Sequence, residues 1–282
     1  MKNKVIPKTI HYFWFGHAPL PPLMEKCIKS WKQFCPDYQI KRWDETNFDI
    51  QNSCDYVKEA YKAKKWAFVS DYARFYVLNK YGGIYLDTDV ELIKPINKIV
   101  NNGPFLAKET EKFDSINPGL GMATYPNNPL YKEIISDYNR SHYLSPEGVP
   151  NSTPVGKRIV TLLVRDGLKE SRGIQVIDGI NIYPKDYFCP LNYFTGKLEF
   201  TENTVAIHHF AASWQDDKEK KYHKFGQYVT RKFGYKVGEK SEEILRAPYS
   251  IRNKLRQIGI RKTLIYYMKK LRRKLQFQIE HF

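Results

Sequence analysis

The sequence predicts an α/β fold with a mostly parallel central sheet, followed by a basic helical tail. Short apolar runs rich in β-branched and aromatic residues alternate with longer segments in which apolar residues recur every three or four positions. This alternation of strand and helix is typical of a sheet covered by helices. The 282 residues are 42% hydrophobic and 15% aromatic, which is enough for one large core or for a domain with an appendage.

The first part of the chain predicts a strand, a helix and a second strand. TIHYFWFG, residues 9–16, reads as a strand of β-branched and aromatic residues. A Pro-rich loop then leads into a helix, because Met24, Cys27 and Trp31 recur at helical spacing. YQIKRWD, residues 38–44, follows as a short strand.

A helix is predicted between Ala63 and Tyr81, where Gly82 and Gly83 fit its C-terminal stop signal. The apolar run IYL that follows predicts a buried strand, and this strand delivers Asp87 and Asp89. Burying unpaired acids there would cost several kcal/mol, so the two carboxylates indicate a ligand.

The rest of the chain predicts further strands and helices, with a boundary near residue 238. The expected elements are a short helix and a strand within 94–109, a strand within 116–128, helices at 129–141 and 152–167, two strands within 173–184, and a late strand from 204. The expected division is a main domain of residues 1–238 and a helical extension of residues 239–282.

The net charge of +16 suggests, at first, a nucleic-acid or anionic-surface partner. Eleven basic residues lie between Arg246 and Lys274, and no acid occurs in that stretch before Glu280. Without these eleven charges the chain carries about +5, which is ordinary for a soluble domain. The basicity therefore belongs mainly to a tail, and nucleic acid is not the expected partner.

The cysteines and the hydrophobic runs predict a cytoplasmic protein. The four cysteines show neither a CxxC pair nor zinc-ligand spacing, so they are expected to be reduced thiols without a chemical role. The N-terminal stretch does not resemble a secretory signal, and no apolar run reaches the eighteen or so residues of a membrane span.

Asp87 and Asp89, in GGIYLDTDVE, are the first candidates for chemistry. Acids at positions i and i+2 point to opposite faces of a regular strand, so they converge only where the chain turns. Such a turn suits Mg²⁺ or Mn²⁺, since these hard ions take few protein carboxylates and leave positions for substrate phosphates. A solvated turn without function is one alternative. DTDV after an apolar strand also fits phosphotransferases of the haloacid dehalogenase type, in which the first Asp is the nucleophile.

The acids belong to a longer pattern, SDxxRxxxLxxxGGxYxDxD from Ser70 to Asp89, in which Asp71 and Arg74 share one helical face. This pattern resembles the DXD sugar-binding region of glycosyltransferase family 32, which contains yeast initiating mannosyltransferases and many bacterial capsule enzymes. The large clostridial glucosylating toxins carry a related pattern. The opening IPKTIHYFWFG and the late segment AIHHFAASW are similar to the family's corresponding segments.

The resemblance implies a GT-A fold, which is a Rossmann-like nucleotide-binding sheet with the DXD motif at its C-terminal edge. It also implies roles for individual residues. Asp87 matches the acid that faces ribose and sugar, and Asp89 matches the metal ligand. One of the late histidines is expected beside them, His208 at the metal or His209 at the leaving group, and the choice stays open at this point. The expected substrate-binding residues are Trp14 at the nucleobase, Asp71 and Arg74 at the donor sugar, Tyr85, Asn117, Ser213 and Trp214.

The expected function is that of a retaining glycosyltransferase, dependent on Mn²⁺ or Mg²⁺, which moves a sugar from a nucleotide sugar, with UDP-sugar favoured, to a glycan acceptor. A bacterial capsule or surface polysaccharide is the expected product, built on a lipid-linked glycan. A phosphatase and a non-enzymatic nucleic-acid-binding protein are the alternatives.

The basic tail has apolar residues mostly three or four positions apart, and Gly259 is expected to bend it. An amphipathic helix of this kind could pack on the main domain or pair with a second copy. Its charge instead favours peripheral binding to the anionic inner face of the cell membrane.

Overall fold

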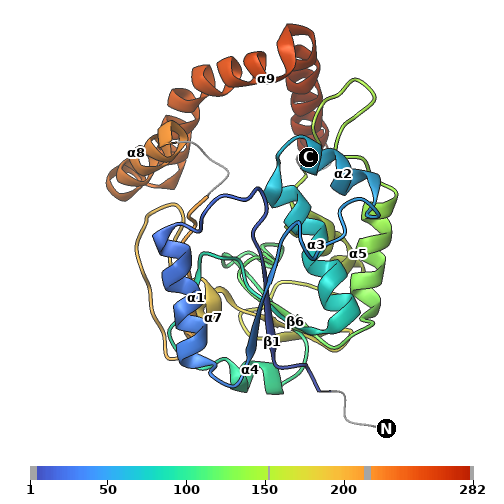
Figure 1. Ribbon diagram of the computed structural model, residues 1–282. Helices are drawn as coiled ribbons and strands as arrows, with labels where there is room; N and C mark the ends of the chain where they lie inside the picture. The colour runs from blue at the N-terminus through green and yellow to red at the C-terminus, as the bar shows by residue number, and fades with distance from the viewer. Residues whose placement is uncertain (1–4, 152, 213–216, 280–282) are drawn as a thin grey trace. The chain divides into compact units, whose positions relative to one another are not determined.

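The computed structural model describes residues 5–151, 153–212 and 217–279. The chain divides into two compact units, of which the first holds the sheet (Figure 1). The first unit comprises Met1–Ser141 and Thr153–Trp214, and the second comprises His142–Ser152 and Gln215–Phe282. The second unit thus begins well before residue 238. Whether sugar transfer needs only residues 1–238 stays a prediction.

A seven-stranded sheet forms the centre of the first unit, with the strand order β2-β1-β3-β6-β5-β8-β7. Five strands run in one direction, and β6 and β7 run against their neighbours. The predicted α/β class with a mostly parallel central sheet is therefore confirmed. The strands are β1 (Thr9–Phe13), β2 (Gln39–Trp43), β3 (Gly83–Tyr85), β5 (Phe105–Ala107), β6 (Met122–Thr124), β7 (Gln175–Ile177) and β8 (Ile180–Tyr183).

Helices cover the sheet, and a small ribbon of two strands lies beside it. In Figure 1, α1 lies on one side of β1, and α3 and α5 lie on the other. Helix α3 packs against β1, β3 and β6, whereas α1 packs against β4 of the ribbon. The ribbon strands are β4 (Val90–Leu92) and β9 (Ala206–His208), which are antiparallel. The helices of this unit are α1 (Pro22–Phe34), α2 (Asp55–Lys62), α3 (Trp66–Tyr81), α4 (Asn97–Asn101), α5 (Pro129–Asn139), α6 (Val155–Arg165) and α7 (Lys185–Phe188).

The largest core cluster connects the sheet, α1 and the ribbon. Trp31 of α1 is fully buried, and its ring meets that of Tyr12 at 5.7 Å between centroids. Its indole N–H donates a hydrogen bond of 2.7 Å to the carbonyl of Val90. A buried side chain of this size contributes roughly 2 to 3 kcal/mol through the area it removes from water. Trp31 therefore fixes the start of β4, which directly follows Asp89.

His11 of β1 explains why two glycines follow α3. Its Nδ1 accepts a hydrogen bond of 3.0 Å from Trp43 Nε1, so its Nε2 carries the proton and donates to the Gly82 carbonyl at 3.1 Å. A Cβ atom on Gly83 would lie 2.9 Å from that Nε2 and 2.7 Å from the carbonyl oxygen of Thr9, and the φ of Gly83 is +101°. Only glycine fits there. The histidine of the opening segment and the GG pair thus together place the strand that leads to Asp87.

The second unit contains a helical hairpin of α8 (Asp217–Phe233) and α9 (Tyr235–Ile279), so the predicted helical C-terminal tail is confirmed. The two backbones approach closely at Gly238, where a Cβ atom would lie 1.8 Å from Thr230 Oγ1. Helix α9 is interrupted at Gly259, whose φ of 76° and ψ of 170° are not helical, as the sequence predicted. Each helix that the structure describes is too short or too polar to cross a bilayer.

We predict that His11 makes stability depend on pH. Burial lowers the pKa of His11 to about 4, although the hydrogen bond to Gly82 opposes this shift. The unfolded chain therefore binds the proton more strongly, so the stabilisation is complete above about pH 6.5 and is lost as the pH falls towards 4. Between pH 7 and pH 5 this residue should remove up to about 2 kcal/mol from the free energy of unfolding.

Urea denaturation at both pH values measures this loss. His11→Gln should lack that part of the pH dependence, whereas His17→Gln, at an exposed histidine, should retain it. The same pH dependence in the wild type and in His11→Gln would show that His11 does not carry it.

Candidate active site

The candidate site lies where the parallel neighbours β1 and β3 end. Trp14 directly follows β1, and Asp87 follows β3 by two residues. The chain turns at Thr88 and Asp89, and the amide of Val90 closes this turn by donating to the Asp87 carbonyl at 3.0 Å. This turn lets the two carboxylates of the DXD motif point into one site, as expected from their spacing in the sequence.

Asp87, Asp89 and His208 form a cluster that could hold a metal ion, because one ligand atom from each lies within 4.8 Å of the others. The pairing of β9 with β4 places His208 opposite Val90, next to the DXD turn. His208 Nε2 lies 3.3 Å from Asp89 Oδ1, and its Nδ1 is buried without a hydrogen-bond partner among the described residues. The two carboxylates suit Mn²⁺ or Mg²⁺, and the imidazole of His208 could add a nitrogen ligand beside them. The three residues predicted as metal ligands are thus found together.

The buried Asp89 and His208 stabilise each other's charges. Burial by itself raises the pKa of Asp89, but the charge of His208, with hydrogen bonds from His208 and the Ala211 amide, outweighs burial and lowers that pKa to about 2. Burial also disfavours protonated His208, yet the Asp89 carboxylate raises its pKa overall. A divalent cation in the cluster would take over the role of the His208 proton.

A buried guanidinium connects α3 to the DXD motif. Arg74 is only 5% exposed, and its Nε donates a hydrogen bond of 3.1 Å to the Ser70 carbonyl. One terminal nitrogen donates to Asp71 at 2.8 Å, and the other lies 3.5 Å from Asp87 Oδ1. Tyr85 completes the group, because its ring lies 4.7 Å from the guanidinium and its hydroxyl donates to Asp87. Arg74 therefore fixes the positions of two acids that are sixteen residues apart.

Asp71 has unused hydrogen-bonding capacity. Among the residues that the structure describes, only Arg74 donates a hydrogen bond to it, and only to Oδ1. Burial raises the pKa of Asp71 to about 6, although the charge of Arg74 lowers it. A mostly buried carboxylate with a spare oxygen is suited to accept hydrogen bonds from ligand hydroxyls.

His209 points to a different acid. Its Nε2 lies 2.8 Å from Glu91 Oε2, and Lys26 lies 2.9 Å from the same carboxylate. Only its backbone contacts the DXD motif, by donating to the Asp89 carbonyl at 3.0 Å. The structure thus brings His208, and not the ring of His209, to the two acids. The catalytic role assigned to His209 stays a prediction without a contact that favours it.

Asn117 approaches Asp87 through Gly119. Asn117 Oδ1 accepts a hydrogen bond of 2.8 Å from the Gly119 amide, and its Nδ2 donates to Glu109 at 2.6 Å. The Gly119 carbonyl accepts from the Asp87 amide at 3.1 Å, and a Cβ atom on Gly119 would lie 2.2 Å from Asp87 Oδ2. Glu109 and Gly119 are site residues that the sequence analysis missed. A single glutamate after a strand has no sequence signature. The two glycines of INPGLGM, in contrast, are a sequence signal of a close backbone approach.

The structure gives less information on the other predicted site residues, Trp14, Ser213 and Trp214. Trp14 is half-buried against the core, and its indole N–H donates to the Ala18 carbonyl at 2.7 Å, which fixes the ring. It lies at the expected edge of the sheet, and its contact with a nucleobase stays a prediction. Ser213 and Trp214 lie outside the described residues, so their closing role also stays a prediction.

Sequence comparisons agree with the geometry. Residues 21–106 match the glycosyltransferase sugar-binding region containing the DXD motif. This segment includes Asp71, Arg74, Asp87 and Asp89. An uncharacterised glycosyltransferase of Acanthamoeba polyphaga mimivirus is 27% identical over 205 residues, which are 68% of this chain and 76% of that protein. Inositol phosphoceramide mannosyltransferase 1 of Schizosaccharomyces pombe is 28% identical over 150 residues, and the chain spans only 45% of its length.

Two solved structures show weak similarity. The PaToxG glycosyltransferase has a TM-score of 0.42 and 18% identity, over 58% of this chain and 70% of its own. A glycosyltransferase involved in the glycosylation of the major capsid of PBCV-1 has a TM-score of 0.41 and 14% identity, over 73% of this chain and 94% of its own.

We predict that Gly119→Ala displaces Asp87 without unfolding the protein. The backbone of Gly119 does not need a positive φ, so the added Cβ conflicts mainly with the movable carboxylate of Asp87 and with Asn117. The melting temperature in EDTA should stay within a few degrees of the wild type, whereas its rise on addition of Mn²⁺ should be largely lost. Gly173→Ala is the matched control, because nothing lies within 4 Å of its added Cβ. If Mn²⁺ raised the melting temperature of Gly119→Ala as much as that of the wild type, Asp87 would not be a metal ligand.

Proposed function

We propose that this chain, which belongs to the glycosyltransferases whose sugar-binding region contains a DXD motif, uses a divalent cation to transfer a sugar from a UDP-sugar to a glycan. The observation that carries the proposal is the position of the Asp87, Asp89 and His208 cluster beside the Asp71–Arg74 pair. Metal ligands and an acceptor of hydroxyl hydrogen bonds are the two features that a site for a nucleotide sugar needs.

The first half of the proposed chemistry concerns the leaving group. Breaking the bond between the anomeric carbon and the diphosphate leaves negative charge on the phosphate oxygen. When bound, Mn²⁺ or Mg²⁺ stabilises this charge without a proton transfer. Asp87, Asp89 and His208 would hold the cation, and the Ala211 amide and Trp31 keep Asp89 and the strand after it in place. The cluster is thus fixed before the donor binds, which favours electrostatic catalysis.

The second half concerns the sugar. The spare oxygen of Asp71 would accept hydrogen bonds from sugar hydroxyls, and Arg74 would keep Asp71 and Asp87 at a constant separation. Because Arg74 already contacts both acids and the Ser70 carbonyl, we assign it chiefly a positioning role. Such positioning is worth several kcal/mol when it holds reacting groups in line.

We propose front-face attack as the route to retention. Retention needs either a carboxylate nucleophile or attack from the side that the leaving group departs. Each acid of the site already has a role in the proposal: Asp87 and Asp89 in the metal cluster, Asp71 between Arg74 and the sugar hydroxyls, and Glu109 at Asn117. The bond from the acceptor oxygen to the anomeric carbon would then form as the bond to the phosphate breaks, and the acceptor proton would pass to the departing phosphate.

The phosphatase alternative would make Asp87 the nucleophile. Its Oδ1 accepts a hydrogen bond from Tyr85 and faces Arg74, and the DXD-region match extends over the helix that supplies Arg74. These observations favour a metal- and sugar-binding role for Asp87 over direct attack on phosphorus.

The acceptor is proposed to be a lipid-linked glycan of a capsular or surface polysaccharide, assembled at the cytoplasmic face of the cell membrane. Support comes from the resemblance to capsule enzymes. One relative is named as a mannosyltransferase that acts on inositol phosphoceramide, which makes mannose a donor sugar to include in any test.

We predict that Asp89→Asn abolishes donor turnover while the fold persists. The test records slow hydrolysis of a panel of nucleotide sugars, including UDP-glucose and GDP-mannose, with and without Mn²⁺. Loss of the carboxylate should reduce the rate by at least about a hundredfold, since one metal ligand is removed. Asp178→Asn, at an exposed turn, is the matched control and should keep the wild-type rate. Turnover that does not require a metal ion, or turnover by Asp89→Asn at the wild-type rate, would contradict the proposal.

We predict that Trp14→Ala weakens UDP and a UDP-sugar equally. A stacking contact of about 1 to 3 kcal/mol is lost whatever sugar is attached. Trp14→Phe should recover most of the affinity, because an aromatic face is restored although the hydrogen bond to Ala18 is not. Isothermal titration calorimetry with both ligands makes the measurement. Weakening confined to the UDP-sugar would place Trp14 at the sugar instead of the base.

A further inference from the structure

Hydrophobic side chains are unusually exposed on the C-terminal hairpin. Of 21 large hydrophobic residues exposed in the described part of the chain, twelve lie between Phe225 and Met268. On the second half of α9, Ile260, Leu264 and Met268 are 72%, 60% and 64% exposed. They are spaced by four residues, so they form one stripe along the helix. We call these three residues the apolar stripe.

The side of this helix next to the apolar stripe packs inside its own unit. Thr263 is only 3% exposed, and its hydroxyl donates to the Gly259 carbonyl at 2.7 Å. Tyr267 lies 3.5 Å from Ser250, hydroxyl to hydroxyl, and a Cβ atom on Gly148 would lie 2.6 Å from Lys262 Nζ. The orientation of the helix within the unit is therefore set by these contacts, and the apolar stripe is the face left open.

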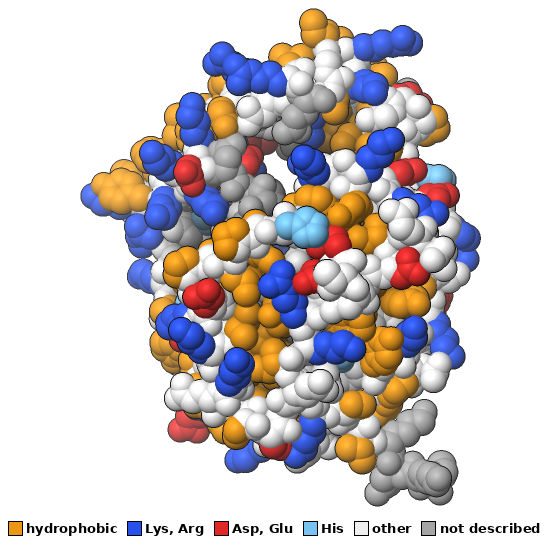
Figure 2. All heavy atoms as spheres, in the orientation of Figure 1, with side chains coloured by type: hydrophobic (Ala, Val, Ile, Leu, Met, Phe, Trp, Pro, Cys, Tyr) orange, Lys and Arg blue, Asp and Glu red, His pale blue; other side chains and the backbone are white. Residues whose placement is uncertain are grey.

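The hairpin that carries the apolar stripe is strongly basic. Residues 217–279 contain 19 Lys and Arg against five Asp and Glu. Arg252, Arg256 and Arg261 are exposed on α9 near the stripe and the kink, and Figure 2 shows Lys and Arg beside hydrophobic side chains over α8 and α9. The exposed surface thus combines apolar and cationic groups.

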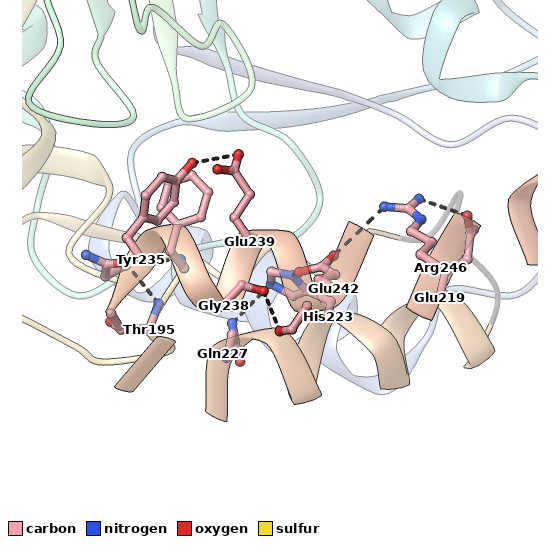
Figure 3. A network of polar contacts seen from close by, with 12 residues as sticks. Thr195, Glu219, His223, Gln227, Tyr235, Gly238, Glu239, Glu242 and Arg246 are labelled. Atoms are coloured by element: carbon pink, nitrogen blue, oxygen red, sulfur yellow. Dashed lines mark hydrogen bonds and ion pairs between the residues drawn. The ribbon is translucent and has the colours of Figure 1, made fainter. Parts of the chain in front are cut away.

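Three of the five acids of the hairpin, Glu219, Glu239 and Glu242, are engaged within it (Figure 3). Glu242 lies between α8 and α9, 3.0 Å from His223 Nδ1 and 4.0 Å from Arg246. Glu219 binds Arg246 at 2.8 Å, and Glu239 accepts from the Tyr235 hydroxyl at 2.9 Å. These contacts neutralise Arg246, whereas the sequence from residue 247 to residue 279 contains ten further Lys and Arg and no Asp or Glu.

We propose that the apolar stripe and the arginines near it bind the surface of an anionic lipid bilayer, with the part of α9 after Gly259 lying in the plane of the interface. Apolar side chains would enter the boundary between headgroups and acyl chains, and the basic side chains would contact lipid phosphates. Each basic residue near such a surface contributes up to about 1 kcal/mol. This inference does not depend on the reaction proposed for the first unit.

Other occupants fit the surface less well. A second copy of the chain would cover the stripe but would bring two strongly positive helices together, which is unfavourable. A nucleic acid would match the charge but would leave Ile260, Leu264 and Met268 without apolar contacts. An anionic bilayer satisfies both requirements at once.

Cosedimentation of the full chain with vesicles tests the proposal. The protein should bind vesicles that contain phosphatidylglycerol, bind pure phosphatidylcholine vesicles much more weakly, and dissociate as salt is added. The triple variant Ile260→Gln, Leu264→Gln, Met268→Gln should bind at least about tenfold more weakly to the anionic vesicles. The variant Arg252→Gln, Arg256→Gln, Arg261→Gln should also bind at least about tenfold more weakly, and its binding should depend less steeply on salt, since three of the 19 basic residues of the hairpin are removed.

Matched controls come from the first unit. Val176→Gln with Leu198→Gln removes exposed apolar side chains outside the hairpin, and Lys29→Gln, Lys32→Gln, Lys132→Gln removes the same number of exposed charges. Both controls should bind vesicles like the wild type, and circular dichroism should show equal helix content in all variants. Donor turnover by the hairpin variants is a separate readout and should be unchanged.

Three outcomes would overturn the proposal. The first is no binding of the wild type to anionic vesicles. The second is unchanged binding by the apolar-stripe variant, which would reduce the interaction to charge alone. The third is a concentration-dependent dimer in sedimentation velocity that the apolar-stripe variant abolishes, because it would assign the stripe to a second copy.

Discussion

The cost of burying charge is the constraint on which this site depends. Arg74 and Asp89 are both nearly inaccessible to water, and an isolated charge in such a place would destabilise the fold by several kcal/mol. Each is therefore held by an opposite charge and by hydrogen bonds, Arg74 by Asp71 and Asp87, and Asp89 by His208 and the Ala211 amide. The same contacts that make burial tolerable also bring together groups from α3, the DXD turn and β9. One network of contacts thus both stabilises the buried charges and positions the side chains of the site.

Much of this arrangement follows from local sequence. The helix before Gly82, the strand IYL and the need for a turn between Asp87 and Asp89 can all be read from spacing and residue type. Their assignment to a sugar-transferring site required the longer pattern from Ser70 to Asp89, since a bare DXD is common. The predicted position of Trp14 at the same sheet edge follows from the parallel pairing of β1 with β3.

Other parts of the site depend on contacts between residues far apart in sequence. The sequence alone does not show whether His208 or His209 faces the metal cluster, because this depends on the register of β9 against β4. Gly119 is needed because Asp87 occupies the space that a Cβ would fill, and Gly83 because His11 does the same. Likewise, the residues 142–152 join the helical unit although they lie within the sheet-forming part of the sequence. Such relations are set by packing, and local propensity does not encode them.

In the proposed reaction, one divalent cation is shared by the protein cluster and the donor diphosphate. Pulsed electron paramagnetic resonance of Mn²⁺ bound to the protein with UDP tests it most directly, because coupling to ¹⁴N and to ³¹P reports each ligand separately. Both couplings are expected in the wild type, and the directly coordinated ¹⁴N signal should be lost in His208→Gln but not in His209→Gln. A Mn²⁺ spectrum without ³¹P coupling, or with an imidazole signal that survives in His208→Gln, would contradict it.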